Sequence, residues 1–257
     1  MIGIFDSGFG GLTVMREIIR ELPSEDIIYF GDTAHLPYGT KSRRNVQRYS
    51  GQILSFLMKK KVRLVAVACH TASSYALSYL QKRSRVPVLG MIQPGVEGVL
   101  GRKDAGRVGI IGTPGTIKAR AYEKALKKAG RGIRVISQAC PLFVPLVEEG
   151  WIRHQITKKV AEIYLKKMGR KIDALILGCT HYPLLKNVIG RTLGKKVMLI
   201  DPAAVTARLI RDKYPSEEKK KPVYRFYVSD DPEKFRRLGK KFLGRKIESV
   251  SLSRCTG

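Results

Sequence analysis

Short runs of apolar and β-branched residues alternate along most of the chain with segments whose apolar residues recur at helical spacing. In the segment at 12–22, for example, leucine, methionine and isoleucine recur every three or four residues, as on one face of an amphipathic helix. Strands that are apolar on both faces, separated by such helices, are typical of parallel sheets covered on each side. The pattern predicts an α/β fold with strands at residues 2–5, 27–30, 64–68, 86–89, 108–111, 133–137, 174–177 and 197–200.

The sequence also contains a weak internal repeat. IGIFDSG at 2–8 resembles VGIIGTPG at 108–115, and a cysteine, Cys69 or Cys179, follows at a similar distance in each half. Repeats of this kind indicate two similar structural units. We therefore predict two parallel-sheet α/β domains related by a pseudo-twofold axis, with the active site in the cleft between them. The first would comprise residues 1–92 plus 205–257, and the second residues 93–204.

Polar and thiol side chains follow several predicted strands at their carboxyl ends. In open α/β sheets, ligands bind at this edge. If the two halves face one another, two thiols approach a shared cleft from opposite sides. The residues concerned are Asp6, Ser7, Cys69 and Thr71 in the first half, and Thr113, Cys179, Thr180 and His181 in the second.

Both cysteines lie at predicted junctions between a loop and a helix, close to threonine and histidine. A helix N-terminus and a nearby imidazolium lower the pKa of a thiol from about 8.5, so we expect reactive thiols. One such thiol indicates a covalent nucleophile. Two facing thiols indicate proton transfer, in which one removes a proton from a carbon acid and the other returns one to the opposite face. The alternative is that both are small buried hydrophobic residues.

These motifs also resemble two other kinds of site. The glycine-rich turn DSGFGGLT at 6–13 resembles a phosphate-binding turn, but Thr13 stands where the third glycine should be and Asp6 would repel phosphate. The set Cys69, His70, Cys179 and His181 has the composition of a zinc site but lacks its usual spacing. We therefore predict no metal and no nucleotide cofactor.

The charge of the chain is strongly positive, with 49 Lys and Arg against 21 Asp and Glu, a formal net charge of +28. A basic field attracts nucleic acids and small anions alike. The basic residues are spread over most amphipathic segments without a recognisable nucleic-acid motif, so we favour solvated helix faces, although the charge leaves nucleic-acid binding open.

No apolar run is long enough for a membrane helix, and the four cysteines do not suggest a disulfide framework. We expect a cytoplasmic protein.

Five motifs together resemble the glutamate racemases of the aspartate/glutamate racemase family over essentially the whole chain. They are DSGFGG (6–11), YFGDTAHLPYG (29–39), VACHTAS (67–73), CPLFVPLVEEG (140–150) and LGCTHYPLL (177–185). The resemblance implies a cofactor-independent enzyme that interconverts L- and D-glutamate, supplies D-glutamate for peptidoglycan and cell shape, and forms a homodimer. A racemase of a related amino acid such as aspartate, and a catalytically impaired basic homologue that binds nucleic acid, are the alternatives.

The resemblance also implies roles for particular residues. Cys69 would act on D-glutamate and Cys179 on L-glutamate, with Asp6 and His181 assisting the adjacent thiols and Glu148 close by. Substrate-binding positions would be Asp6, Ser7, Pro37, Tyr38, Gly39, His70, Thr71, Thr180 and His181.

One position departs from the family pattern, which has asparagine where this chain has His70. A histidine is larger than asparagine, can change charge near neutral pH, and donates a hydrogen bond only in a suitable tautomer. We predict that activity survives this change with an altered pH dependence.

Overall fold

The computed structural model describes residues 1–102, 105–130, 132–169, 171–215 and 221–253, and contains two parallel β-sheets. The larger sheet has the strand order β10-β9-β2-β1-β3-β4, and the smaller one the order β6-β5-β7-β8. The strands span Ile2–Asp6 (β1), Ile27–Gly31 (β2), Leu64–Val67 (β3), Val88–Gly90 (β4), Arg107–Gly112 (β5), Arg134–Ala139 (β6), Ala174–Gly178 (β7), Met198–Ile200 (β8), Tyr224–Val228 (β9) and Ser251–Leu252 (β10).

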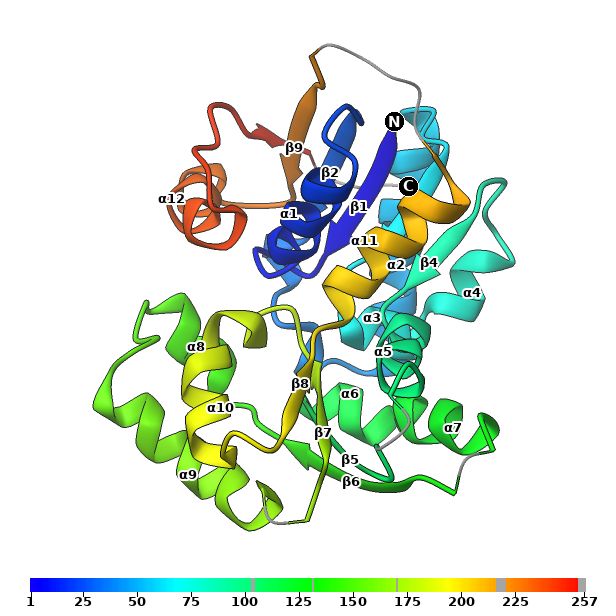
Figure 1. Ribbon diagram of the computed structural model, residues 1–257. Helices are drawn as coiled ribbons and strands as arrows, with labels where there is room; N and C mark the ends of the chain where they lie inside the picture. The colour runs from blue at the N-terminus through cyan, green and yellow to red at the C-terminus, as the bar shows by residue number, and fades with distance from the viewer. Residues whose placement is uncertain (103–104, 131, 170, 216–220, 254–257) are drawn as a thin grey trace.

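Helices connect the strands and cover both sheets (Figure 1). They span Leu12–Glu21 (α1), Arg43–Lys59 (α2), His70–Tyr75 (α3), Leu77–Gln81 (α4), Ile92–Leu100 (α5), Pro114–Ala119 (α6), Ala121–Lys128 (α7), Phe143–Glu148 (α8), Gln155–Gly169 (α9), Lys186–Leu193 (α10), Pro202–Lys213 (α11) and Pro232–Leu243 (α12). Short 3-10 turns lie at Thr33–His35, Tyr38–Thr40 and Tyr182–Leu185.

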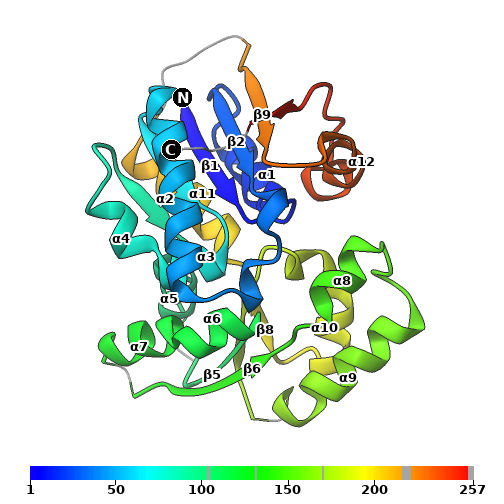
Figure 2. The same ribbon diagram turned by 180° about the vertical axis from the view of Figure 1, so that it is seen from behind.

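Strands β1, β2, β3 and β7 are buried along their whole length, and β5 is buried except for Arg107, as their apolar sequences predict. Successive side chains of a strand point to opposite faces. In β1, Ile2 and Ile4 pack in the cluster that includes Leu12 of α1, whereas Phe5 joins a second cluster with Val46 of α2. Figure 2, seen from behind, shows α2 and α3 on the face of the large sheet opposite α1 and α11.

The two sheets share one topology, which confirms the prediction of two similar α/β halves. In each, the first strand along the chain lies between the second and the third, and the fourth pairs with the third: β2-β1-β3-β4 and β6-β5-β7-β8. The chain crosses to the smaller sheet through α5 and returns through α11, which packs on α1 and α5. The exact domain bounds, 1–92 plus 205–257 and 93–204, stay a prediction.

The C-terminal segment completes the larger sheet. Strand β9 pairs with β2 and extends the sheet by one strand, and helix α12 packs on α1. The two-residue strand β10, paired with β9, was not predicted, because its exposed residues carry no apolar pattern.

Candidate functional site

A small cavity lies where the two halves meet, and the carboxyl ends of strands from both sheets contribute to it. Both predicted thiols, Cys69 and Cys179, line it and are nearly buried. The cavity volume is about 20 Å³, which holds about one water molecule. The other lining residues are Ser7, Leu36, Pro37, Tyr38, Gly39, His70, Thr71, Thr113, Thr116, Val144, Gly178, Thr180 and His181.

On the first side of the cavity, Cys69 is the N-cap of α3. Its Sγ atom accepts a hydrogen bond from the backbone N–H of Ala72 at 3.5 Å and lies 3.8 Å from the hydroxyl oxygen of Ser7. Asp6, at the end of β1, is fully buried, and its Oδ2 accepts from the N–H of Gly8 at 3.0 Å. Burial raises the pKa of Asp6, while His181 opposes that rise.

The pKa of Cys69 is raised to about 12, first by burial and then by the negative charge of Asp6. The hydrogen bonds that Cys69 makes with Ala72 and Ser7 lower its pKa, but by less than burial and Asp6 raise it. The prediction that the helix N-terminus makes this thiol acidic is therefore wrong for Cys69. Desolvation of the thiolate outweighs the helix N-terminus when the site excludes water.

On the second side, Cys179 belongs to a short polar chain. Its Sγ atom lies 3.8 Å from Nδ1 of His181, and Nε2 of His181 lies 3.0 Å from Oε1 of Glu148. Burial by itself lowers the pKa of His181, but the contacts with Cys179 and Glu148 raise it to about 10. His181 is therefore an imidazolium at neutral pH, with one N–H directed at the sulfur.

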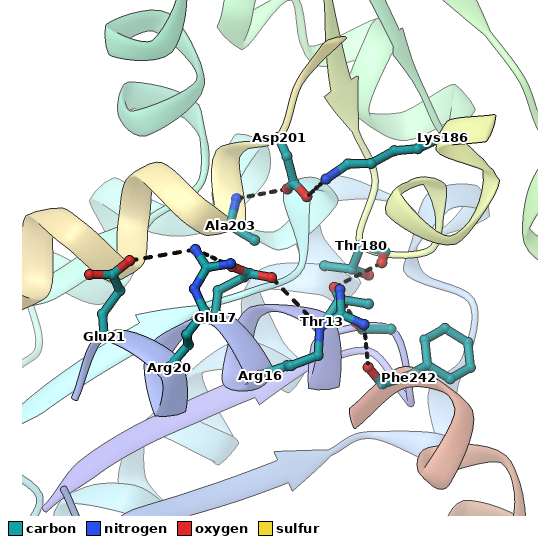
Figure 3. A network of polar contacts seen from close by, with 11 residues as sticks. Thr13, Arg16, Glu17, Arg20, Glu21, Thr180, Lys186, Asp201, Ala203 and Phe242 are labelled. Atoms are coloured by element: carbon teal, nitrogen blue, oxygen red, sulfur yellow. Dashed lines mark hydrogen bonds and ion pairs between the residues drawn. The ribbon is translucent and has the colours of Figure 1, made fainter. Parts of the chain in front are cut away.

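Helix α1 holds the backbone of this second side in place (Figure 3). The hydroxyl of Thr13 donates to the carbonyl of Thr180 at 3.0 Å. Arg16 donates to the carbonyl of Phe242 in α12 at 3.4 Å, and the Phe242 ring meets the His181 ring edge-on at a centroid distance of 5.2 Å. The first half therefore contributes directly to the position of His181.

Polar contacts join the two halves across the cavity. The Thr180 hydroxyl donates to Oδ1 of Asp6 at 3.4 Å. The hydroxyl oxygen of Thr71 lies 2.8 Å from that of Thr113 and 3.1 Å from that of Thr116. These hydrogen bonds connect the two halves directly beside the two thiols.

The glycine-rich turn after β1 packs against the second half. A Cβ atom at Gly10 would lie 2.6 Å from Nδ1 of His181 and still closer to the Thr180 hydroxyl. Glycine is therefore required for close packing at this turn. Oδ2 of Asp6 already accepts the N–H of Gly8 that a phosphate would need, so the turn does not fit the phosphate-binding alternative.

His70 is buried, and one of its ring nitrogens contacts a tyrosine of the second half. Its Nδ1 lies 2.8 Å from the hydroxyl oxygen of Tyr122, and that hydroxyl donates to the carbonyl of Met91 at 3.1 Å. Since the single hydroxyl proton of Tyr122 is directed at Met91, His70 donates from Nδ1. Burial lowers the pKa of His70 to about 3, so the ring is neutral at physiological pH. A ring that stays neutral argues against the predicted effect of His70 on the pH dependence of activity, which a pH profile would test.

One wall of the cavity contains Tyr38 and its neighbours Pro37 and Gly39. The Tyr38 hydroxyl donates to Oδ2 of Asp32 at 2.5 Å, and Asp32 also contacts His35 and the hydroxyl of Ser229. Asp32 therefore connects Tyr38 to Ser229, the residue that follows β9.

No group of three or more His, Cys, Asp or Glu suited to a metal ion occurs in the part of the chain that the structure describes. Cys69, Cys140 and Cys179 are free thiols, and Cys255 lies outside the described residues.

Residues 2–210 match the protein family described as Asp/Glu/Hydantoin racemase. The chain belongs to this family. It is 49% identical to a glutamate racemase of Geobacter metallireducens, covering 97% of this chain and 94% of that protein. It is 48% identical to a glutamate racemase of Aquifex aeolicus, covering 96% and 95%. The crystal structure of glutamate racemase from Francisella tularensis in complex with D-glutamate has a TM-score of 0.92 and 41% identity, with 99% and 97% covered.

Membership of the Asp/Glu racemase family confirms the resemblance that the five motifs suggested. The structure places ten of the sequence-predicted site residues around the cavity: Ser7, Pro37, Tyr38, Gly39, Cys69, His70 and Thr71 from the first half, and Cys179, Thr180 and His181 from the second. Asp6 and Glu148 do not line it, but they contact two residues that do, Thr180 and His181 respectively.

Sequence reasoning missed several residues of this racemase cavity. Thr113 was recognised at a strand end but not assigned to the site, and the internal repeat could have identified it, because it follows β5 as Ser7 follows β1. Thr116, Val144 and Leu36 carry no local signal. Tyr122, the partner of His70, lies 52 residues away in α7.

Proposed function

We propose that this chain is a cofactor-independent glutamate racemase that interconverts L- and D-glutamate by proton transfer between two cysteines. The observation that carries the proposal is that Cys69 and Cys179 reach one cavity from opposite halves of the molecule. The glutamate racemases with 41% to 49% identity over nearly the whole chain support the choice of substrate.

The proposed reaction needs one thiolate and one thiol. The thiolate of one cysteine takes the proton from the α-carbon and becomes a thiol. The thiol of the other cysteine then gives its proton to the opposite face of the carbanion and becomes a thiolate. In this proposal Cys69 removes the proton of D-glutamate and Cys179 that of L-glutamate.

The protein groups around Cys69 do not favour its thiolate, because burial and Asp6 raise the pKa of Cys69 to about 12. A bound amino acid brings a positively charged ammonium group into the same cavity. An opposite charge within about 4–6 Å favours the ionised form of a thiol and of a carboxyl group. We propose that the substrate ammonium, held in the cavity near the buried charge of Asp6, activates Cys69 on binding.

Stabilisation of the carbanion needs hydrogen-bond donors at the substrate carboxylate. The hydroxyls of Ser7, Thr71 and Thr180 line the cavity and are suited to that role. His181 would exchange a proton with Cys179, with Glu148 stabilising its charge. Pro37, Tyr38, Gly39 and His70 would complete the walls of the substrate site, since they line the same cavity.

A cavity of about 20 Å³ is too small for glutamate, since a cavity that binds even the smaller molecule benzene has a volume of about 150 Å³. We propose that the halves separate to admit substrate and close around it. The hydroxyl contacts of Thr71 with Thr113 and Thr116 would break in that motion.

The biological setting follows from the family resemblance and is part of the proposal. We propose a cytoplasmic homodimer that supplies D-glutamate for peptidoglycan, with domains at 1–92 plus 205–257 and at 93–204. None of the described helices is long and apolar enough to cross a membrane.

Loss of the circular dichroism signal of L-glutamate on incubation with the protein would test the proposed activity. In deuterium oxide, the product should carry solvent deuterium at the α-carbon, and an unlabelled product would contradict proton exchange with two bases. Cys69→Ser and Cys179→Ser should each reduce racemisation by at least about 10³-fold, whereas Cys140→Ser, a buried thiol that does not line the cavity, should remain active. Faster racemisation of aspartate than of glutamate would instead favour the related substrate.

A further inference from the structure

A second surface feature is a groove of about 1060 Å³ that lies on the outer face of α2 and continues over α4. Five exposed cations line it: Arg44, Arg48, Lys59, Arg83 and Arg85. Its described lining contains no aspartate or glutamate, and none of its residues lines the cavity with the two thiols. The groove is therefore separate from the proposed racemase site.

The cations of the groove lack the acidic partners that other arginines of this protein have. Arg63, Arg107 and Arg211 each pair with a carboxylate. Within the described residues, no ion pair involves any of the five groove cations. Five unneutralised positive charges in one groove create a local field that attracts anions.

The first turn of α2 adds to this field at a cost in stability. Helix α2 begins after the N-cap Ser42 with Arg43 and Arg44, and its first turn has no acidic residue. Cations near a helix N-terminus are repelled by the helix dipole, with a typical cost of about 0.3–1 kcal/mol each. A bound anion would offset this repulsion between the cations and the helix dipole.

Aromatic rings lie among these cations. The guanidinium of Arg83 is stacked over the ring of Tyr79 at 3.8 Å, and that of Arg48 lies 4.9 Å from the ring centre of Tyr49. Gly51 of α2 faces Tyr79, and a Cβ atom there would lie 3.2 Å from the ring, so glycine leaves room for it. Stacked guanidinium planes and aromatic rings are the surfaces on which unpaired nucleotide bases stack.

We propose that this groove binds single-stranded nucleic acid, with phosphates on Arg44, Arg48, Lys59 and Arg85 and a base on the stacked pair of Arg83 and Tyr79. The combination of unpaired cations and stacking surfaces favours a single strand over an acidic polypeptide, which has no bases to stack. The proposal does not depend on the racemase activity.

A second basic groove on α9 and α10 provides a matched control. It has a volume of about 850 Å³ and is lined by four exposed cations, Arg153, Lys158, Lys166 and Arg191. Unlike the first groove, it contains a carboxylate, Glu162, and no aromatic ring lines it. Substitution of its cations therefore distinguishes binding at one specific groove from general attraction by the +28 charge of the chain.

The test measures fluorescence anisotropy of labelled 16-nucleotide oligo-dT and oligo-U with the full chain between 50 and 300 mM salt. The variant R44E/R48E/R83E/R85E and the control R153E/K158E/K166E/R191E lower the formal net charge equally. We expect the groove variant to bind at least about 30-fold more weakly and, having lost three phosphate contacts, to lose about two units of the slope of log K against log salt. The control should change affinity by less than about threefold.

Equal losses in the groove variant and in the control would overturn the proposal, as would absence of saturable binding to both oligonucleotides at 50 mM salt. Tyr79→Leu keeps the charge and should weaken binding about fivefold or more through lost stacking. Competition by polyglutamate as effective as that by oligo-dT at equal charge would also overturn the assignment to nucleic acid. Unchanged far-ultraviolet circular dichroism and glutamate racemisation would establish that each variant is folded.

Discussion

Glu148→Gln tests the electrostatic account of the Cys179 side of the cavity. Nε2 of His181 lies 3.0 Å from Oε1 of Glu148, and the Glu148 side chain is 18% exposed, so the charge pair is mostly shielded from water. The amide keeps the shape and a neutral hydrogen-bond acceptor. A charge-assisted hydrogen bond exceeds a neutral one by about 1–1.5 kcal/mol, so the pKa of His181 should fall by about one unit from its value of about 10.

The sign of the stability effect follows from the same shift. The pKa of His181 is raised above that of an unfolded histidine, about 6.5, so its charge contributes stability that is fully present below pH 6.5 and is lost as the pH rises through 10. Glu148→Gln should therefore lower the unfolding free energy by about 1–1.5 kcal/mol at pH 6.5, and this difference should diminish near pH 10.

Nuclear magnetic resonance of the imidazole ring over pH 6 to 11, together with urea unfolding at pH 6.5 and 10, measures both quantities. Glu149→Gln removes the same charge one residue further along the chain, where the side chain is exposed, and is the matched control. An unchanged pKa of His181 in Glu148→Gln, or an equal shift in Glu149→Gln, would show that Glu148 does not hold the charge of His181.

Three further predictions concern the packing around the cavity. Because His70 is neutral with a pKa of about 3, His70→Asn should leave the pH profile of kcat/KM between pH 6 and 9 unchanged, and a displaced profile would contradict this. Tyr122→Phe removes the partner of a buried histidine and should lower the unfolding free energy in urea by about 1–3 kcal/mol. Gly10→Ala places a methyl group against His181 and Thr180, so kcat/KM should fall at least about tenfold, whereas Gly106→Ala, with open space around it, should leave activity unchanged.

The strands and the candidate thiols could be predicted from sequence because each depends on a local pattern. Strands β1 and β7 are continuous apolar runs, and parallel strands deliver the residues that follow them to one edge of a sheet. The placement of Cys69 and Cys179 on one cavity follows from two similar halves that face each other. No contact between distant segments had to be known for this step.

The charge states around the cavity could not be predicted, because they depend on contacts between distant segments. Cys69 follows β3, but its pKa is set by burial and by Asp6 at the end of β1, 63 residues earlier in the chain. The neutral state of His70 depends on burial beneath α7, where Tyr122 lies. The sequence suggested a titrating imidazole at His70, and tertiary burial removed that property.

The surroundings of the two thiols differ, although the free enantiomers of glutamate have equal free energy in water. Cys69 lies beside the buried carboxyl of Asp6, whereas Cys179 lies beside the imidazolium of His181. Since the overall equilibrium constant of racemisation is one, kcat/KM must be the same in both directions for the protein and for every variant. The electrostatic difference between the two sides can therefore affect only the separate values of kcat and KM. A substitution at Glu148 should change kcat by different factors in the two directions. KM should then also change by different factors, so that kcat/KM stays equal in both directions.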